Sequence, residues 1–282
     1  MIDNIVVAGA GTMGTGIAIA AAQKGVAVTL FDTNEHVLSL SKNAIEQYLD
    51  ALVQKQKIPS EEKQAISDRI RFTSSIETCK ASLVIEAIIE IEAAKVELFN
   101  KLAEVNDSNT IFATNTSSLS VNAIQQKIIH PERVAGLHFF NPAQLMKLVE
   151  VVKADQTDDL VIEQLMEFCY HLQKTPVICK DAPGFIVNRV ARHYYLEAMK
   201  LVEKNIATFE SVDEIMEATG FKMGPFKLMD LIGMDINLAV STSLYHAFNQ
   251  AERFEPSPLQ IKKVQEGNLG RKTGKGFYTY SK

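Results

Sequence analysis

Residues 5–14 read IVVAGAGTMG, and this stretch decides the expected fold of the 282-residue chain. A short β-branched run comes first, a G-x-G-x-x-G loop follows it, and an Ala-rich helical pattern comes last. Glycines at these spacings let the backbone turn sharply and let a pyrophosphate approach the positive N-terminus of the helix. The stretch therefore predicts a strand, a dinucleotide-binding loop and a helix. The predicted cofactor-binding residues of the loop are Gly9, Gly11, Thr12, Met13 and Gly14.

An acidic residue follows the next apolar run at the distance typical of such a loop. The run Val26–Phe31 ends at Asp32, which lies 18 residues beyond Gly14. A carboxylate there accepts hydrogen bonds from the adenosine ribose hydroxyls and repels a 2′-phosphate, so we expect NAD rather than NADP as cofactor. FAD is the competing occupant, and a glycine turn beside a solvated Asp is the structural alternative.

Short apolar runs alternate with helical patterns along the first 180 residues. The runs are rich in β-branched residues, as strands buried on both faces are, and an apolar stripe from Ile91 to Val105 recurs at helical spacing between two of them. This alternation predicts an α/β fold with a Rossmann-type doubly wound sheet. The predicted strands are Ile5–Ala8, Val26–Phe31, Ile70–Thr73, Leu83–Glu86, Thr110–Ala113 and Val134–Phe139.

The pattern changes after residue 181. A turn signal, Ala182-Pro183-Gly184, precedes a helical stretch with few strand candidates. We expect a NAD-binding domain over residues 1–181 and a smaller all-helical domain for substrate binding and dimerisation over residues 182–282. Its helices carry more apolar surface than a unit of this size easily buries, which predicts a homodimer through the C-terminal domain. The first apolar stripe of this domain comprises Val187, Val190, Tyr194, Ala198 and Leu201.

Composition argues against several classes of protein. Apolar residues make up 46% of the chain and charged residues 22%, as in ordinary globular proteins. A net charge of −5 with no basic block argues against nucleic acid as a partner. Because no stretch approaches the about 18 apolar residues of a membrane span, and the N-terminal segment lacks a positive region, we expect a cytoplasmic protein with no membrane partner.

The cysteines predict no metal site. Cys79, Cys169 and Cys179 are odd in number, far apart and without metal-ligand spacing. We therefore expect reduced thiols in the protein core.

Polar residues follow one of the predicted strands and begin the predicted helical domain. The segment from Ala113 to Leu119, ATNTSSL, comes directly after a strand, at the sheet edge where parallel sheets bind ligands. An Asn or Ser that caps a helix is an equally good explanation. Asn188 falls in the first turn of a predicted helix, where its amide can donate to a substrate oxygen, and an ordinary first-turn polar residue is the alternative.

His138 and Glu150 form the candidate catalytic pair. His138 ends one apolar run, and Glu150 lies within the next, 12 residues later. If the runs pair around the intervening loop, the imidazole and the carboxylate meet. An unpaired carboxylate in an apolar strand costs several kcal/mol, and an imidazolium is its natural partner. Such a pair can take a hydroxyl proton while hydride leaves the same carbon, although a purely structural His–Glu bridge is the alternative.

The chain resembles the 3-hydroxyacyl-CoA dehydrogenase family along essentially its whole length. The blocks that carry the resemblance are GAGTMG at 9–14, NTSSL at 115–119, GLHFFNP at 136–142, MKLVEVV at 146–152, DAPGFIVNR at 181–189, MGPFKLMDLIG at 223–233 and GRKTGKGFY at 270–278. The resemblance implies NAD-dependent oxidation of an L-3-hydroxyacyl-CoA, with 3-hydroxybutyryl-CoA the expected substrate, to the 3-ketoacyl-CoA. It also implies a Rossmann-type domain and a helical dimerisation domain.

The resemblance implies roles for individual residues. His138 matches the catalytic base and Glu150 its orienting carboxylate. Ser117 and Asn188 match residues that hydrogen-bond the reacting 3-oxygen, and Lys55 matches a lysine that meets the CoA phosphates. The implied cofactor-side positions are Glu90, Lys95, Asn115, Asn141 and Lys275. For Glu90, Lys95, Lys275 and Lys55, a solvated surface charge is the alternative.

The chain departs from the family pattern at two positions. Gln144 stands where many relatives have a second proline, so the loop before Glu150 is expected to differ in shape. Arg192 stands where short-chain relatives have apolar residues, and it resembles the branch that acts on 3-hydroxyadipyl-CoA in phenylacetate breakdown. A guanidinium there suits a distal substrate carboxylate, which makes 3-hydroxyadipyl-CoA the alternative substrate.

Two alternative functions stay open, one from another class of protein and one a different dehydrogenase. A non-catalytic NAD-binding structural protein can keep the same fold. A dehydrogenase of small free hydroxy acids would not depend on the CoA group of the substrate.

Overall fold

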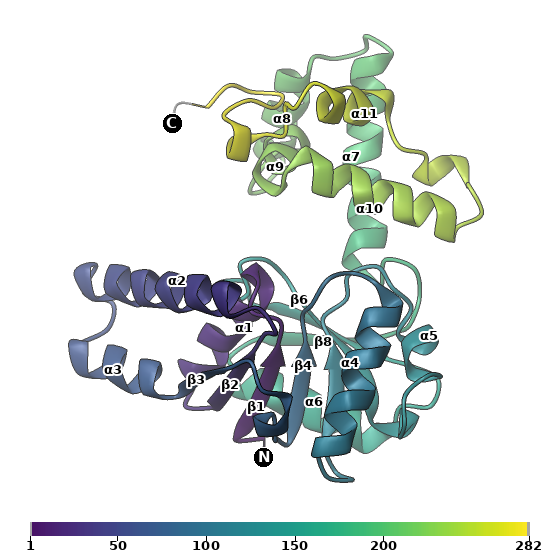
Figure 1. The fold of residues 1–282 in the computed structure, drawn as a ribbon. Coiled ribbons are helices and arrows are strands. Elements are labelled where there is room, and N and C mark those ends of the chain that lie inside the picture. Colours follow the sequence, from purple (N-terminus) through teal and green to yellow (C-terminus); the bar gives the residue numbers. More distant parts are fainter. Residues whose placement is uncertain (1, 281–282) are drawn as a thin grey trace. The chain divides into compact units, whose positions relative to one another are not determined.

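An eight-stranded sheet forms the centre of residues 1–181 in the computed structural model, which describes residues 2–280 (Figure 1). Its strands lie in the order β3-β2-β1-β4-β5-β6-β7-β8. The first six in this order are parallel to one another, whereas β7 runs antiparallel to β6 and parallel to β8. The strands are β1 (Asn4–Ala8), β2 (Ala27–Phe31), β3 (Ile70–Thr73), β4 (Leu83–Glu86), β5 (Ile111–Thr114), β6 (Val134–Phe139), β7 (Leu148–Lys153) and β8 (Thr175–Lys180).

Helices cover both faces of this sheet, which confirms the predicted doubly wound α/β class. Alternation along the strands divides the side chains between the faces, so Ile5 and Val7 of β1 pack in one apolar cluster with Ile17 of α1 and Leu165 of α6. On α4, Phe99 meets Phe112 of β5 with ring centroids 5.7 Å apart. The helices are α1 (Thr12–Ala22), α2 (Glu35–Gln54), α3 (Ser60–Asp68), α4 (Glu92–Val105), α5 (Val121–Gln125) and α6 (Asp159–His171), with 3₁₀ turns η1 (Ile76–Thr78) and η2 (Pro131–Arg133).

The strand order positions a ligand crevice. Strand β1 has β2 on one side and β4 on the other, so the chain reverses its direction of winding between β1 and β4. In open parallel sheets, ligands bind beside the carboxyl ends of the strands at such a point. At the far edge, β8 contains Pro176, which an edge strand tolerates because one of its sides needs no backbone donors.

Residues 182–282 form a second unit of helices, as predicted for the fold class. Its core includes Tyr195, Met199, Phe226 and Met234. The buried carboxylate of Asp230 accepts hydrogen bonds from the backbone N–H groups of residues 277 and 278, which holds the tail onto the unit. The helices are α7 (Val187–Glu203), α8 (Phe209–Ala218), α9 (Pro225–Ile232), α10 (Met234–Ala247) and α11 (Pro258–Gln265), with 3₁₀ turns η3 (Glu252–Phe254) and η4 (Arg271–Thr273).

The buried face of α7 differs from the predicted stripe. Val190 belongs to the predicted apolar stripe but is 66% exposed, whereas Arg192 is buried. A charged residue can take this place because Arg192 finds hydrogen-bond partners on α10, in Asn237 and Ser241. Apolar spacing alone does not reveal such partners.

The structure also bears on membrane spans, metal sites and the state of the cysteines. Across residues 2–280, no helix is both long and apolar enough to span a bilayer. The same residues hold no cluster of three or more His, Cys, Asp or Glu side chains suited to a metal ion. Cys79 and Cys169 are buried free thiols, and Cys179 is a half-buried one.

Candidate active site

A cleft of about 930 Å³ lies at the carboxyl ends of strands β1 to β4. The glycine loop after β1 forms one wall, and the segments after β2, β3 and β4 form the others. This is the crevice that the strand order predicts for a ligand. The residues that line it include Gly9, Gly11, Thr12, Met13, Asp32, Ser75, Ala87, Ile88 and Leu98.

The three loop glycines meet different constraints. Gly9 has φ +108°, and a Cβ there would lie 2.5 Å from the carbonyl oxygen of Ala87. A Cβ on Gly14 would lie 1.7 Å from the carbonyl oxygen of Gly9. A Cβ on Gly11, by contrast, would meet no protein atom within 4 Å. The fold therefore requires glycine at 9 and 14, whereas Gly11 leaves room for a ligand beside the backbone.

The start of α1 suits an anion. Gly11 is the N-cap of α1 and supplies no side-chain hydrogen bond to its first N–H groups, and the first turn carries no acidic residue. Backbone N–H groups and the positive end of the helix dipole are the features that bind pyrophosphate. The loop thus fits the phosphates of a dinucleotide.

Asp32 joins the end of β2 to the glycine loop. Its Oδ2 accepts a hydrogen bond of 2.9 Å from the backbone N–H of Ala10, and its Oδ1 accepts one of 2.9 Å from that of Asn34. These bonds fix the carboxylate in the wall of the cleft. This placement fits the predicted contact with ribose hydroxyls.

His138 and Glu150 meet across two strands. They are directly opposite each other in the antiparallel pairing of β6 and β7, with Nδ1 of the imidazole 2.8 Å from Oε2 of the carboxylate. His138 is 6% exposed and Glu150 is 1% exposed. Both side chains point away from the cluster that buries Leu137 and Val149, because side chains alternate along a strand. The structure therefore brings together the pair that the sequence predicts.

Asn115 connects the loop after β5 to the strand that carries His138. Its side-chain oxygen accepts a hydrogen bond of 2.8 Å from the backbone N–H of Phe139, and its own N–H donates to the carbonyl oxygen of Glu86. The loop that contains Ser117 is therefore tied to the carboxyl ends of both β4 and β6.

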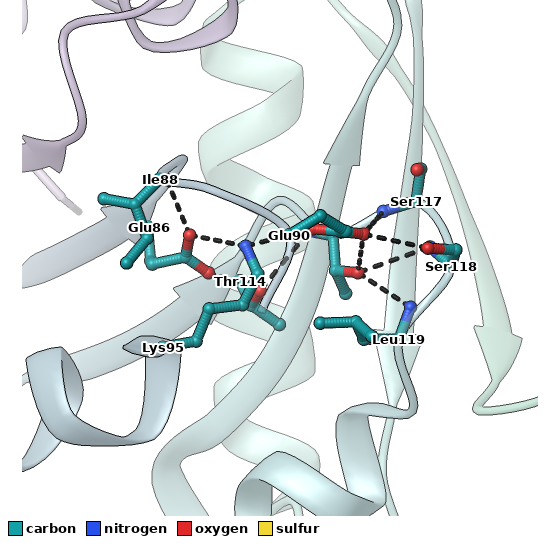
Figure 2. Close-up of polar contacts among 9 residues, drawn as sticks. Glu86, Ile88, Glu90, Lys95, Thr114, Ser117, Ser118 and Leu119 are labelled. Carbon is teal, nitrogen blue, oxygen red and sulfur yellow. Dashed lines mark hydrogen bonds and ion pairs between the residues drawn. The ribbon is translucent and has the colours of Figure 1, made fainter. Parts of the chain in front are cut away.

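The carboxylate of Glu90 accepts hydrogen bonds from three consecutive residues of the loop after β5, residues 116–118 (Figure 2). Its Oε1 accepts hydrogen bonds from the Thr116 hydroxyl, the Ser117 N–H at 3.1 Å and the Ser118 hydroxyl at 3.1 Å. Its Oε2 lies 3.2 Å from Nζ of Lys95. Burial alone would raise the pKa of Glu90, but the Lys95 charge and these hydrogen bonds hold it below its usual value.

Glu86, which the sequence prediction omits, completes this group. It is the last residue of β4 and is fully buried. Its Oε1 accepts hydrogen bonds from Lys95 Nζ at 2.6 Å and from the Ile88 N–H at 2.7 Å, and its Oε2 accepts one from the Thr114 hydroxyl at 2.7 Å. An acidic residue within an apolar strand is the signal that singles out Glu150, and Glu86 carries the same signal.

Other predicted residues of the first unit lie at its surface. Lys55 is exposed and caps the C-terminus of α2, where the chain turns toward α3. Asn141 is exposed in the loop that follows β6. Their predicted contacts with the CoA phosphates and the cofactor stay predictions.

Asn188, Arg192 and Lys275 belong to the second unit, and their predicted roles stay predictions. Asn188 lies in the first turn of α7, as expected, and Lys275 is exposed in the tail. Arg192 is only 3% exposed, and its Nη1 donates to the Asn237 carbonyl and side-chain oxygens and to the Ser241 hydroxyl. Burial lowers the pKa of Arg192 to about 10. Its Nε has no hydrogen-bond partner within residues 2–280.

Comparison with known families matches both parts of the chain. Residues 4–182 match the model of the 3-hydroxyacyl-CoA dehydrogenase NAD binding domain, and residues 184–280 match the model of the 3-hydroxyacyl-CoA dehydrogenase C-terminal domain. These matches confirm NAD as the predicted cofactor and NAD-dependent 3-hydroxyacyl-CoA dehydrogenases as the predicted class of enzyme.

Individual relatives resemble the chain over nearly its full length. The 3-hydroxyadipyl-CoA dehydrogenase of Escherichia coli K12 is 45% identical over 99% of this chain, which spans 59% of that longer protein. The mitochondrial hydroxyacyl-coenzyme A dehydrogenase of Sus scrofa is 41% identical, over 99% of this chain and 92% of the relative. The crystal structure of (S)-3-hydroxybutyryl-CoA dehydrogenase from Ralstonia eutropha superposes with a TM-score of 0.94 at 35% identity, covering 100% of both chains.

Proposed function

Because the chain belongs to the 3-hydroxyacyl-CoA dehydrogenase family, we propose that it oxidises an L-3-hydroxyacyl-CoA reversibly to the 3-ketoacyl-CoA with NAD. The observation that carries this proposal is the 2.8 Å contact between His138 and Glu150. The pair lies on β6 and β7, in the same sheet whose strands β1 to β4 form the cofactor cleft. A base is thus present in the unit that binds the oxidant.

The first unit has the groups that would hold the cofactor. NAD, when bound, supplies the acceptor for the hydride that leaves C3 of the substrate. The glycine loop and the start of α1 suit its pyrophosphate, and Asp32 suits its adenosine ribose. Glu90, Asn115 and Asn141 are proposed as further contacts. Lys95 is 1% exposed and contacts Glu86 and Glu90, so we assign it an indirect role through these carboxylates.

His138 is proposed as the base. Its Nδ1 contacts Glu150, so the proton of the substrate 3-hydroxyl would go to Nε2. The O–H bond breaks and its electron pair turns the C3–O bond into a carbonyl, while the hydrogen on C3 leaves with the electron pair of the C3–H bond as hydride. Glu150 holds the imidazole in one tautomer and stabilises the imidazolium that forms. Ser117 and Asn188 are proposed to hydrogen-bond the 3-oxygen.

The acyl group has two candidates. We propose a short chain, with 3-hydroxybutyryl-CoA as the principal substrate, because a relative of that name matches the chain from end to end. The second candidate is 3-hydroxyadipyl-CoA, which the 45% identical relative from E. coli favours. Arg192 was predicted to meet its distal carboxylate. The burial of this guanidinium against Asn237 and Ser241 instead supports a role in packing the helical unit.

A spectrophotometric assay of NADH tests the activity. Purified protein should form NADH from NAD and L-3-hydroxybutyryl-CoA, and it should consume NADH with acetoacetyl-CoA. Comparing kcat/KM for 3-hydroxybutyryl-CoA and 3-hydroxyadipyl-CoA decides between the two acyl groups. Equal turnover of free 3-hydroxybutyrate would favour a dehydrogenase of small hydroxy acids. NADH binding without turnover of any hydroxyacyl-CoA would favour the non-catalytic alternative.

We also propose a homodimer through the C-terminal unit and a cytoplasmic location. Support for the dimer comes from large apolar side chains that the single chain leaves exposed in this unit, and such patches favour association. Light scattering after size-exclusion chromatography should give twice the mass of one chain, and a monomer at micromolar concentration would contradict the proposal. The side chains are Ile206, Ile215, Phe221, Leu231 and Ile236.

A further inference from the structure

The carboxylates of Glu86 and Glu90 both contact the ammonium group of Lys95, next to the loop that contains Ser117 (Figure 2). Lys95 Nζ lies 2.6 Å from Glu86 Oε1 and 3.2 Å from Glu90 Oε2. Glu86 and Lys95 are almost completely buried, whereas the Glu90 side chain is 39% exposed. Burying such charges is costly, and apolar residues of similar volume would often stabilise a protein as well or better. Stability alone therefore explains this group poorly.

The Glu86 end of the group is rigid. Glu86 ends β4, which lies between β1 and β5 within the sheet. Three donors converge on its carboxylate, namely the Lys95 ammonium, the Ile88 N–H and the Thr114 hydroxyl. Burial raises the pKa of Glu86, and these three donors offset part of that effect because an ionised carboxylate accepts all three hydrogen bonds. They also hold the carboxylate in one orientation.

Glu90 lies in one loop and contacts a second loop. Glu90 lies between β4 and α4, and its Oε1 accepts hydrogen bonds from three consecutive residues after β5. Its other oxygen contacts Lys95. Lys95 is therefore the contact that links this carboxylate to Glu86, and the carboxylate in turn accepts the hydrogen bond of the Ser117 N–H.

We propose that Glu86 is a positioning residue for the dehydrogenase reaction, acting through Lys95 and Glu90 on the loop that carries Ser117. The proposal rests on the proposed function, in which Ser117 hydrogen-bonds the substrate 3-oxygen. A small displacement of such a donor lowers the rate strongly, because its alignment with the reacting atom is part of the transition-state stabilisation.

Glu86→Gln tests the proposal with little change in side-chain volume. The amide loses the charge that fixes Lys95, so kcat should fall about tenfold. The matched control is Asp159→Asn, which also turns a carboxylate paired with a lysine, Lys153, into an amide, but at an exposed position on α6. The control should keep the kcat of the unaltered protein. A Glu86→Gln enzyme with kcat within twofold of the unaltered protein would overturn the proposal.

A double-mutant cycle separates positioning from general destabilisation. If Glu86 acts through Ser117, then Ser117→Ala should cost roughly threefold less, or less still, in the Glu86→Gln background than in the unaltered protein. A merely structural role predicts that the two losses multiply independently, and that result would refute the proposal. Glu86→Asp keeps the charge but draws it back from Lys95 by one methylene group, and it serves as the milder variant if Glu86→Gln does not fold.

The Ser117 amide offers a readout that does not need turnover. In ¹H–¹⁵N spectra, Glu86→Gln or Glu86→Asp should move the Ser117 amide signal, because the Glu90 carboxylate that accepts its hydrogen bond moves. Asp159→Asn should leave the signal in place. An unchanged Ser117 signal in both Glu86 variants would contradict the inference even if the enzyme were active. An inactive unaltered protein whose Ser117 signal responds would instead refute the proposed function and keep the positioning.

Discussion

His138 and Glu150 face each other across the antiparallel strands β6 and β7, with the imidazole Nδ1 2.8 Å from the carboxylate Oε2. Both are buried. A buried carboxylate is stabilised by this pairing, and the imidazole is held in one orientation, which is what a general base requires.

Replacing the imidazole should abolish most of the activity. In His138→Gln, kcat should fall about a hundredfold or more, the usual loss for a general base, with little change in NADH affinity measured by fluorescence titration. His246→Gln, at an exposed histidine of the helical unit, is the control and should keep its turnover. Near-normal kcat in His138→Gln would rule out the proposed mechanism.

The charge of Glu150 should also affect a nearby thiol. Burial, followed by the negative charges of Glu150 and Asp181, raises the pKa of Cys179 to about 12. Glu150→Gln removes one of these charges, so alkylation of Cys179 by iodoacetamide at alkaline pH should become faster, because the thiolate is the reactive form. Cys169, whose pKa burial raises to about 12 without a contribution from Glu150, is the internal control. Equal acceleration at both thiols would indicate general loosening instead.

Two glycines of the cofactor loop should respond differently to alanine. A Cβ at Gly14 would lie 1.7 Å from the Gly9 carbonyl oxygen, so Gly14→Ala should lower the thermal midpoint and NADH affinity together. Gly11 has open space around a Cβ, so Gly11→Ala should keep its thermal midpoint yet bind NADH roughly tenfold more weakly, because the methyl group blocks the pyrophosphate. Unchanged NADH affinity in Gly11→Ala would place the cofactor elsewhere.

The two glutamates that contact Lys95 should affect stability at different pH. The pKa of Glu90 is lowered in the folded protein, so its contribution is present above the ordinary value of 4.5 and is lost as pH falls through the folded pKa. The pKa of Glu86 is raised, chiefly by burial, so its contribution is present below 4.5 and is lost as pH rises through the folded pKa. In urea denaturation, Glu90→Gln should lose less free energy of unfolding than the unaltered protein as pH falls below 4.5. Glu86→Gln should gain stability relative to the unaltered protein as pH rises above 4.5. The opposite order would show that the two assignments are reversed.

Arg192 should matter for stability rather than for the choice of acyl group. Arg192→Met removes hydrogen bonds to Asn237 and Ser241 and should destabilise the helical unit by roughly 1–3 kcal/mol. The ratio of kcat/KM for 3-hydroxybutyryl-CoA and 3-hydroxyadipyl-CoA should stay the same. A selective loss with the dicarboxylic substrate would restore the role first predicted for Arg192.

Local patterns in the sequence were sufficient for most of the first unit. The six predicted strands match β1 to β6 to within one residue at each end, because buried parallel strands are short apolar runs and most of these runs are bounded by polar or glycine residues. The pairing of His138 with Glu150 was also predictable, since a carboxylate inside an apolar strand requires a partner on the neighbouring strand.

Tertiary structure alone decided two features. The link from Glu86 through Lys95 to Glu90 joins a strand end, a helix and a loop, and only the fold aligns their side chains. The burial of Arg192 in place of Val190 depends on polar partners that lie 45 residues or more away, at Asn237 and Ser241. Periodicity describes which face of one element is apolar, whereas hydrogen bonding of buried charges depends on what the other elements bring to that face.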